Sequence, residues 1–123
     1  MIRILLADDY TIIRKGVRQI LTQAYPNAIF EEVEQREDWT AKLNMSNWDM
    51  VISDLPMPDR GGLDSLQRIR QKFPEMPVLI LSHYPKENYA ARSLKAGAAG
   101  YIEKDAEPDE LISAVNQVLA ARK

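Results

Sequence analysis

Charged and hydroxyl side chains follow four short apolar runs of this 123-residue chain. They are Asp8 and Asp9 after residues 2–7, Asp54 after residues 51–53, Ser82 after residues 78–81, and Lys104 after residues 101–103. If the runs are parallel strands, their carboxyl ends share the sheet edge at which open α/β domains bind ligands. Carboxylates gathered there repel each other unless a cation or a proton intervenes. The pattern predicts a divalent metal ion, an anionic group handled beside it, and a lysine that balances the charge.

Two kinds of segment alternate along the chain and would position these side chains. Apolar runs at residues 2–7, 29–33, 50–53, 78–82 and 100–103 suit strands buried on both faces of a parallel sheet. Helical periodicity covers residues 11–23, 38–44, 62–73, 86–96 and 108–121. Pro108 suits a first helical position and Gly97 a helix stop. Strict alternation predicts one doubly wound α/β domain.

The periodicity also predicts which helical side chains face the core. The first helix is expected to bury Ile12, Ile13, Val17, Ile20 and Leu21, and the fourth Tyr89, Ala90 and Leu94. Residues 56–62, rich in Pro and Gly, are predicted to form a loop beside Asp54.

Composition limits the class of protein. The length suits one domain, and the net charge of −2 gives no basis for bulk electrostatic binding of nucleic acid. The chain has no cysteine, which excludes disulfides and thiolate metal sites. The sequence has neither the apolar core of a signal peptide nor a run of about 20 apolar residues that could span a membrane. We expect a soluble, cytoplasmic domain.

These residues together resemble the receiver domain of two-component response regulators. That family has an acidic pair after the first strand, a phosphoacceptor Asp after the third, Ser or Thr after the fourth and Lys after the fifth. Residues 54–58 (DLPMP) are similar to the family's D-x-x-M-P motif, and residues 94–104 (LKAGAAGYIEK) to the A-G-A-x-G-Y-x-x-K run of the LuxR/NarL subfamily. Arg14 and Gly16 also resemble that subfamily. The resemblance covers essentially residues 1–123.

The resemblance implies a flavodoxin-like (βα)5 fold, whose parallel five-stranded sheet has the order 2-1-3-4-5, and a role for each motif residue. Asp54 would accept the phosphoryl group, and Ser82 and Lys104 would contact it. Mg²⁺ would be held by Asp8, Asp9, Asp54 and the backbone carbonyl of Pro56. Tyr101 would turn inward as a switch residue when Ser82 moves.

The same resemblance implies partners rather than a substrate for turnover. A sensor histidine kinase would supply the phosphoryl group, and phosphorylation would promote homodimerisation, often through the first and fifth helices in this subfamily. DNA would be bound only through a C-terminal helix-turn-helix domain, which we expect outside this chain. No membrane contact and no enzymatic turnover of its own are expected.

Each motif residue also has a structural interpretation. Asp54 could cap a turn, Asp9 could cap the first helix, and Tyr101 could be a half-buried strand residue. Arg14, Lys15 and Arg18 form a basic cluster that could meet an acidic partner surface, but each taken singly better suits a solvated helix face.

Some positions depart from the family pattern. His83 is expected to be a partly exposed loop residue at the pocket mouth. Tyr10 stands where the subfamily usually has His, and the sequence assigns it no consequence. Pro56 and Tyr84 are bulky and cannot orient an attacking water, so we expect slow self-dephosphorylation.

Three other functions are weighed. An aspartyl-phosphate phosphohydrolase would need a second Asp two residues after its nucleophile, but Tyr10 and Pro56 stand at the two possible positions. A flavin-binding domain would need a phosphate-binding loop rich in Ser, Thr and Gly after the first strand, where the acidic pair would repel the phosphate. A receiver-like interaction module that is not phosphorylated remains the alternative.

Overall fold

The computed structural model describes residues 2–8, 10–33, 40–45, 47–54 and 63–121. Strands and helices alternate as predicted: β1 (Arg3–Ala7), α1 (Thr11–Ala24), β2 (Ile29–Val33), α2 (Thr40–Met45), β3 (Met50–Asp54), α3 (Leu63–Lys72), β4 (Val78–Ser82), α4 (Lys86–Lys95), β5 (Gly100–Glu103) and α5 (Pro108–Ala121). Differences from the predicted ranges are confined to element ends. The loop predicted after β3 lies outside the described residues.

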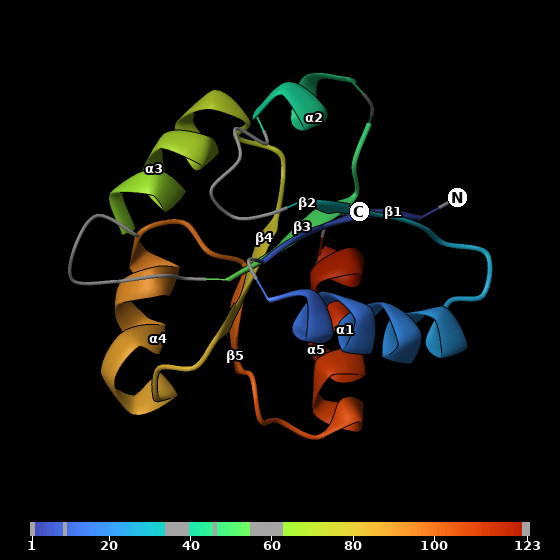
Figure 1. Ribbon diagram of the computed structural model, residues 1–123. Coiled ribbons are helices and arrows are strands. Elements are labelled where there is room, and N and C mark those ends of the chain that lie inside the picture. The colour runs from blue at the N-terminus through green and yellow to red at the C-terminus, as the bar shows by residue number, and fades with distance from the viewer. Residues whose placement is uncertain (1, 9, 34–39, 46, 55–62, 122–123) are drawn as a thin grey trace.

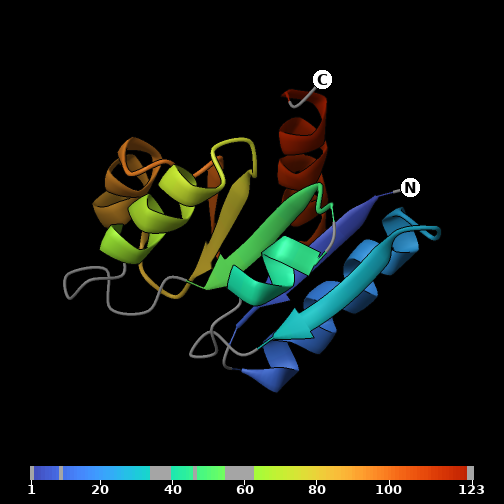
Figure 2. The ribbon, with the colours of Figure 1, turned by 90° about the horizontal axis from the view of Figure 1, so that it is seen from above.

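The strands form one parallel sheet in the order β2-β1-β3-β4-β5, which confirms the predicted topology. Figure 2 shows the strands side by side in this order. Every residue of β3 and β4 is buried. Continuous burial is expected of central strands that helices cover on both faces, which is why their sequences are apolar without alternation.

Two apolar clusters lie on opposite faces of the sheet. Helices α1 and α5 cover one face, and α2, α3 and α4 cover the other (Figure 1). Along β1, Ile4 and Leu6 join the cluster beneath α1 and α5, whereas Leu5 and Ala7 join the other cluster. This alternation follows from the two-residue period of a strand, and it holds the strand ends in fixed register.

Two predictions of buried helical residues are wrong. Ile12 is 85% exposed and Leu94 is 50% exposed. The buried residues of α1 are Val17 and Leu21, and Ile12 lies about 140° around the helix from Val17 at 3.6 residues per turn. In α4 the buried residue is Ser93, directly before Leu94. Both apolar side chains therefore face away from the core.

The predicted signals at helix ends are confirmed. Helix α5 begins at Pro108, whose fixed φ suits a first helical residue. Gly97 follows α4 with a φ of 116°, in the left-handed region that favours glycine. Within the described part of the chain, no helix is both long and apolar enough to cross a membrane.

Candidate functional site

The strand register brings the predicted site residues to one edge of the sheet. Ala7 of β1 lies opposite Ser53 of β3, so that the next residues, Asp8 and Asp54, lie side by side. On the other side of β3, Asp54 lies opposite Leu81. Lys104 follows β5 and donates its backbone N–H to the Ser82 carbonyl at 2.8 Å. The site is thus assembled from the carboxyl ends of four strands.

An ammonium group lies between two carboxylates at this edge. Lys104 Nζ is 3.0 Å from Asp8 Oδ2 and 2.9 Å from Asp54 Oδ1. All three side chains are buried; that of Lys104 is only 2% exposed. Within the described residues, Asp8 Oδ2 and Lys104 Nζ make no hydrogen bond of favourable angle. Their contact is therefore mainly electrostatic. Because two carboxylates face one ammonium, the three side chains together carry a net negative charge.

Ser82 and Tyr101 are joined through the backbone of Tyr84. Ser82 is fully buried, and its hydroxyl accepts the Tyr84 backbone N–H at 3.0 Å. The Tyr101 hydroxyl donates to the Tyr84 carbonyl at 2.7 Å. Burial raises the pKa of Tyr101; a hydrogen bond with Ser82 opposes this rise, and the charge of Glu103 adds to it. The Tyr84 ring packs edge-to-face on Tyr89.

Tyr10 contacts the lysine through its ring, a contact that sequence reasoning did not find. Lys104 Nζ lies 4.7 Å from the centroid of the Tyr10 ring, within cation–π range. His83 is exposed, as expected, and its ring packs edge-to-face against Tyr10 with centroids 5.6 Å apart. The only available sequence signal was an aromatic residue directly after an acidic pair.

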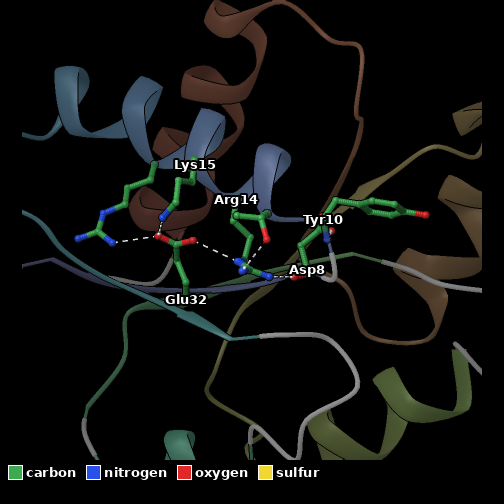
Figure 3. Close-up of polar contacts among 7 residues, drawn as sticks. Asp8, Tyr10, Arg14, Lys15 and Glu32 are labelled. Carbon is green, nitrogen blue, oxygen red and sulfur yellow. Dashed lines mark hydrogen bonds and ion pairs between the residues drawn. The ribbon is translucent and has the colours of Figure 1, made fainter.

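Arg14 ties the acidic edge to the neighbouring strand (Figure 3). Its guanidinium donates to the Asp8 carbonyl and to Glu32 Oε1, the latter at 3.1 Å. Arg18 and Lys15 also reach Glu32, at 3.0 and 3.6 Å. Arg14 is only 12% exposed, so the prediction of a simple solvated face is wrong for this residue. The sequence signal was Glu32 itself, an acidic residue in an otherwise largely apolar strand that needs a cation such as Arg14 as a partner.

The three cations determine the ionisation of Glu32. Burial alone would raise the pKa of its carboxyl, but hydrogen bonds from Arg18 and Arg14 and the charges of Lys15 and Arg14 outweigh burial. The net result is a pKa below the ordinary value, so Glu32 is a fixed anion near neutral pH.

Two predicted site residues, Asp9 and Pro56, lie outside the described residues. In the part of the chain that the structure describes, no three Asp, Glu, His or Cys side chains gather as metal ligands. Of the residues predicted to bind the metal, the structure therefore describes Asp8 and Asp54.

Comparison with known proteins identifies the class of domain. The family described as response regulator receiver domain matches residues 4–116. The response regulator UvrY of Escherichia coli K12 is 31% identical over 123 residues, which is 100% of this chain and 56% of UvrY. The nitrate/nitrite response regulator protein NarL of the same organism is 32% identical over 117 residues, 95% of this chain and 54% of NarL. The chain thus spans about half the length of the curated relatives it matches.

A solved structure agrees. A two-component response regulator of the LuxR family from Aurantimonas sp. SI85-9A1 superposes with a TM-score of 0.79 at 32% identity, covering 98% of this chain and 86% of that one. The chain belongs to the response regulator receiver domain family and is of the LuxR/NarL kind. Receiver domains are signalling domains rather than classical enzymes.

Proposed function

We propose that this domain is a phosphorylation-controlled switch in which Asp54 accepts a phosphoryl group from a sensor histidine kinase. The observation that carries the proposal is the buried Asp54 carboxylate, 2.9 Å from Lys104 Nζ and adjacent to Asp8 at the sheet edge. Carboxylates act as nucleophiles in aspartyl-phosphate chemistry. The alternative, a receiver-like module that is not phosphorylated, gives no role to this buried charge group.

The proposed reaction is one transfer to the protein itself. An Asp54 carboxylate oxygen bonds to phosphorus while the phosphorus–nitrogen bond of a phosphohistidine breaks, and its electron pair stays on the imidazole. Phosphoryl transfer requires mainly positioning and charge compensation from the protein. Lys104 supplies a positive charge beside Asp54, and the Ser82 hydroxyl can donate to a phosphoryl oxygen.

The charge balance of the described residues suits Mg²⁺. Asp8 Oδ2 is a buried oxygen without a hydrogen bond of favourable angle among them, and one lysine does not neutralise two carboxylates. We assign Asp8, Asp9, Asp54 and the Pro56 carbonyl as the groups that would hold the ion, since Mg²⁺ prefers oxygen ligands. When bound, Mg²⁺ would supply positive charge to the phosphoryl oxygens.

The contacts of Tyr84 support a switch role for Tyr101. One peptide segment connects both side chains, because the Tyr84 N–H binds Ser82 and the Tyr84 carbonyl binds Tyr101. A Ser82 hydroxyl that moved toward a phosphoryl group would weaken the first bond and displace this segment. We propose that the displacement reaches the Tyr101 ring and, through it, the surface of α4 and β5.

A groove beside the site suits the kinase. It has a volume of about 270 Å³, lies between α1 and the segment from β5 to α5, and includes Ile12, Gly16, Lys104 and Pro108 in its lining. Ile12 is 85% exposed there, an apolar contact point without a partner in the core. A helix of the kinase in this groove would lie next to the pocket that holds Asp54.

The output lies beyond the domain. We propose that residues 1–123 are the receiver domain of a cytoplasmic transcription regulator, whose DNA-binding domain is a separate part of the protein. Phosphorylation would promote dimerisation of that protein. The length of UvrY and NarL, about twice the part that this chain covers, supports the proposal.

Intact-mass spectrometry tests the phosphoacceptor. The wild type and Asp54→Asn are incubated with phosphoramidate, and separately with an autophosphorylated histidine kinase, with and without Mg²⁺. We expect gain of one phosphoryl group that requires both Asp54 and Mg²⁺. Absence of gain with phosphoramidate and with a panel of kinases would favour the interaction module.

The groove is tested by comparing the two donors. Ile12→Glu should reduce transfer from the kinase about tenfold or more and leave phosphorylation by phosphoramidate unchanged, because a charge replaces an apolar contact. Leu94→Glu is the matched control, since Leu94 is also an exposed apolar helix residue but lies across the sheet. Equal loss of kinase transfer in both variants would contradict the assignment.

A further inference from the structure

Tyr10 is placed to protect Lys104 from solvent. The residue is the N-cap of α1 and makes no side-chain capping hydrogen bond. Its ring extends away from Arg14 and Glu32 (Figure 3). The Tyr10 side chain is more than half exposed, whereas the Lys104 side chain beneath it is 2% exposed. An exposed aromatic ring thus lies in contact with a buried lysine.

Lys104 is held by two kinds of partner. Its ammonium lies 3.0 Å from Asp8 and 2.9 Å from Asp54, which are buried, and 4.7 Å from the centroid of the Tyr10 ring, which is more than half exposed. The negative face of an aromatic ring attracts an ammonium group, and the attraction increases when both are shielded from water. The ring therefore adds a third contact to a cation whose side chain is already 2% exposed.

The position of the ring is fixed by elements that belong to the site. The Tyr10 backbone N–H donates to Asp8 Oδ1 at 2.8 Å, which links the ring to the acidic edge. His83 supports it edge-to-face, at an interplanar angle of 80°, from the turn that follows Ser82. Tyr10 and His83 together are called the aromatic cover below. An exposed tyrosine without such contacts would sample many rotamers and protect nothing.

We propose that the aromatic cover restricts access of small solutes to the phosphoryl pocket and so makes the domain selective for a docked protein donor. The inference rests on the proposed phosphoacceptor role of Asp54. Two reactions are affected. In one, a small donor such as phosphoramidate gives its phosphoryl group to Asp54 and releases ammonia. In the other, a water oxygen bonds to phosphorus, the bond from phosphorus to the Asp54 oxygen breaks, and inorganic phosphate leaves.

Amine labelling tests the cover without any phosphorylation. The protein is treated briefly with an acetylating reagent, and acetylation of Lys104 is measured by peptide mass spectrometry relative to Lys15, which is 69% exposed. Tyr10→Leu should raise the rate at Lys104 about tenfold, as expected for loss of a shielded cation–π contact. Tyr10→Phe, which keeps the ring, should stay within about twofold of the wild type. An unchanged rate in Tyr10→Leu would overturn the inference.

The rates of phosphorylation and of dephosphorylation test whether the aromatic cover restricts access to the pocket. In Tyr10→Leu, phosphorylation by phosphoramidate and decay after donor removal should both be about three- to tenfold faster, while transfer from the kinase changes less than about twofold. Tyr10→Phe should match the wild type. His83→Ala, which leaves Tyr10 and the charged residues in place, should lie between the two.

The two assays separate two kinds of failure. If the wild type takes no phosphoryl group from either donor, the proposed function is wrong, and the labelling rates still decide whether Tyr10 covers Lys104. If Tyr10→Leu exposes Lys104 but leaves the donor and decay rates unchanged, Tyr10 covers the lysine without controlling access, and the inference is wrong. Denaturant unfolding of every variant confirms that the faster rates come from a folded protein.

Discussion

Replacement of Lys104 by Met should destabilise the metal-free domain because it leaves two buried carboxylates facing each other. The ammonium lies 3.0 Å from Asp8 and 2.9 Å from Asp54. At an effective dielectric constant of about 20, each contact contributes about 5 kcal/mol of Coulomb attraction before desolvation is counted. Burying the lysine costs several kcal/mol, which offsets much of that sum. Since Met keeps most of the side-chain volume, the change isolates the charge.

We expect Lys104→Met to lower the free energy of unfolding by about 3–5 kcal/mol, the range seen when one partner of a buried ion pair is removed. A small domain has only about 5–15 kcal/mol in total. The assay is urea unfolding at neutral pH in the presence of a chelator. Lys95→Met is the control, because Lys95 is exposed at the end of α4 and its loss should cost less than about 0.5 kcal/mol.

Two further measurements test the reasoning. Asp54→Asn leaves the Lys104–Asp8 contact intact, and its double-mutant cycle with Lys104→Met should give a coupling energy of about 1–3 kcal/mol. Added Mg²⁺ should stabilise Lys104→Met more than the wild type, because the lysine no longer balances the carboxylates and the metal binds only the folded state. A Lys104→Met variant as stable as the wild type without metal, or zero coupling, would refute the argument.

Three other perturbations have outcomes set by particular contacts. Glu32→Gln should cost about 1–2 kcal/mol at pH 7, because Arg14 and other cations lose a charged acceptor. Because the pKa of Glu32 is lowered in the folded protein, this stability is present above the pKa of an unfolded glutamate, about 4.3. It is lost as pH falls through the pKa of the folded protein. Urea unfolding from pH 7 to pH 3 should therefore show the difference from wild type closing, and a constant difference would contradict the prediction. The raised pKa of Tyr101 predicts an ultraviolet titration midpoint above about 10 that is absent in Tyr101→Phe. The stability that Tyr101 contributes is present below the unfolded pKa of about 10 and is lost as pH rises through the folded pKa. The wild type should therefore lose stability above pH 10 that Tyr101→Phe keeps. Equal losses in the two proteins would contradict the prediction. Gly97→Ala should cost about 1–3 kcal/mol, because φ is 116° and the new Cβ would lie 2.8 Å from Arg70 Cγ. Gly16→Ala in α1, where the new Cβ meets nothing within 4 Å, should instead stabilise by about 0.5–1 kcal/mol, and thermal unfolding that reversed the order of the two would contradict the conformational argument.

The sequence by itself determined the order and type of the elements. Strands such as β3 and β4 are largely continuous apolar runs. Helix α5 begins at Pro108, whose ring fixes φ, and α4 stops before Gly97, which can adopt the positive φ that other residues avoid. Local restriction and periodicity act over a few residues, so they can be read from a chain. The same applies to the placement of Asp8, Asp54 and Lys104, since parallel strand ends must share an edge.

Only the tertiary structure decided which side chains meet across that edge. Tyr10 lies far from Lys104 in sequence, and their contact depends on the rotamer of the ring and on His83 beside it. Likewise, Arg14 is only 12% exposed and pairs with Glu32 of β2 rather than with solvent. Ile12 faces outward although its neighbour Ile13 packs against the core. Such contacts depend on distances between elements that are remote in sequence, and these distances are set when the whole sheet and its helices pack.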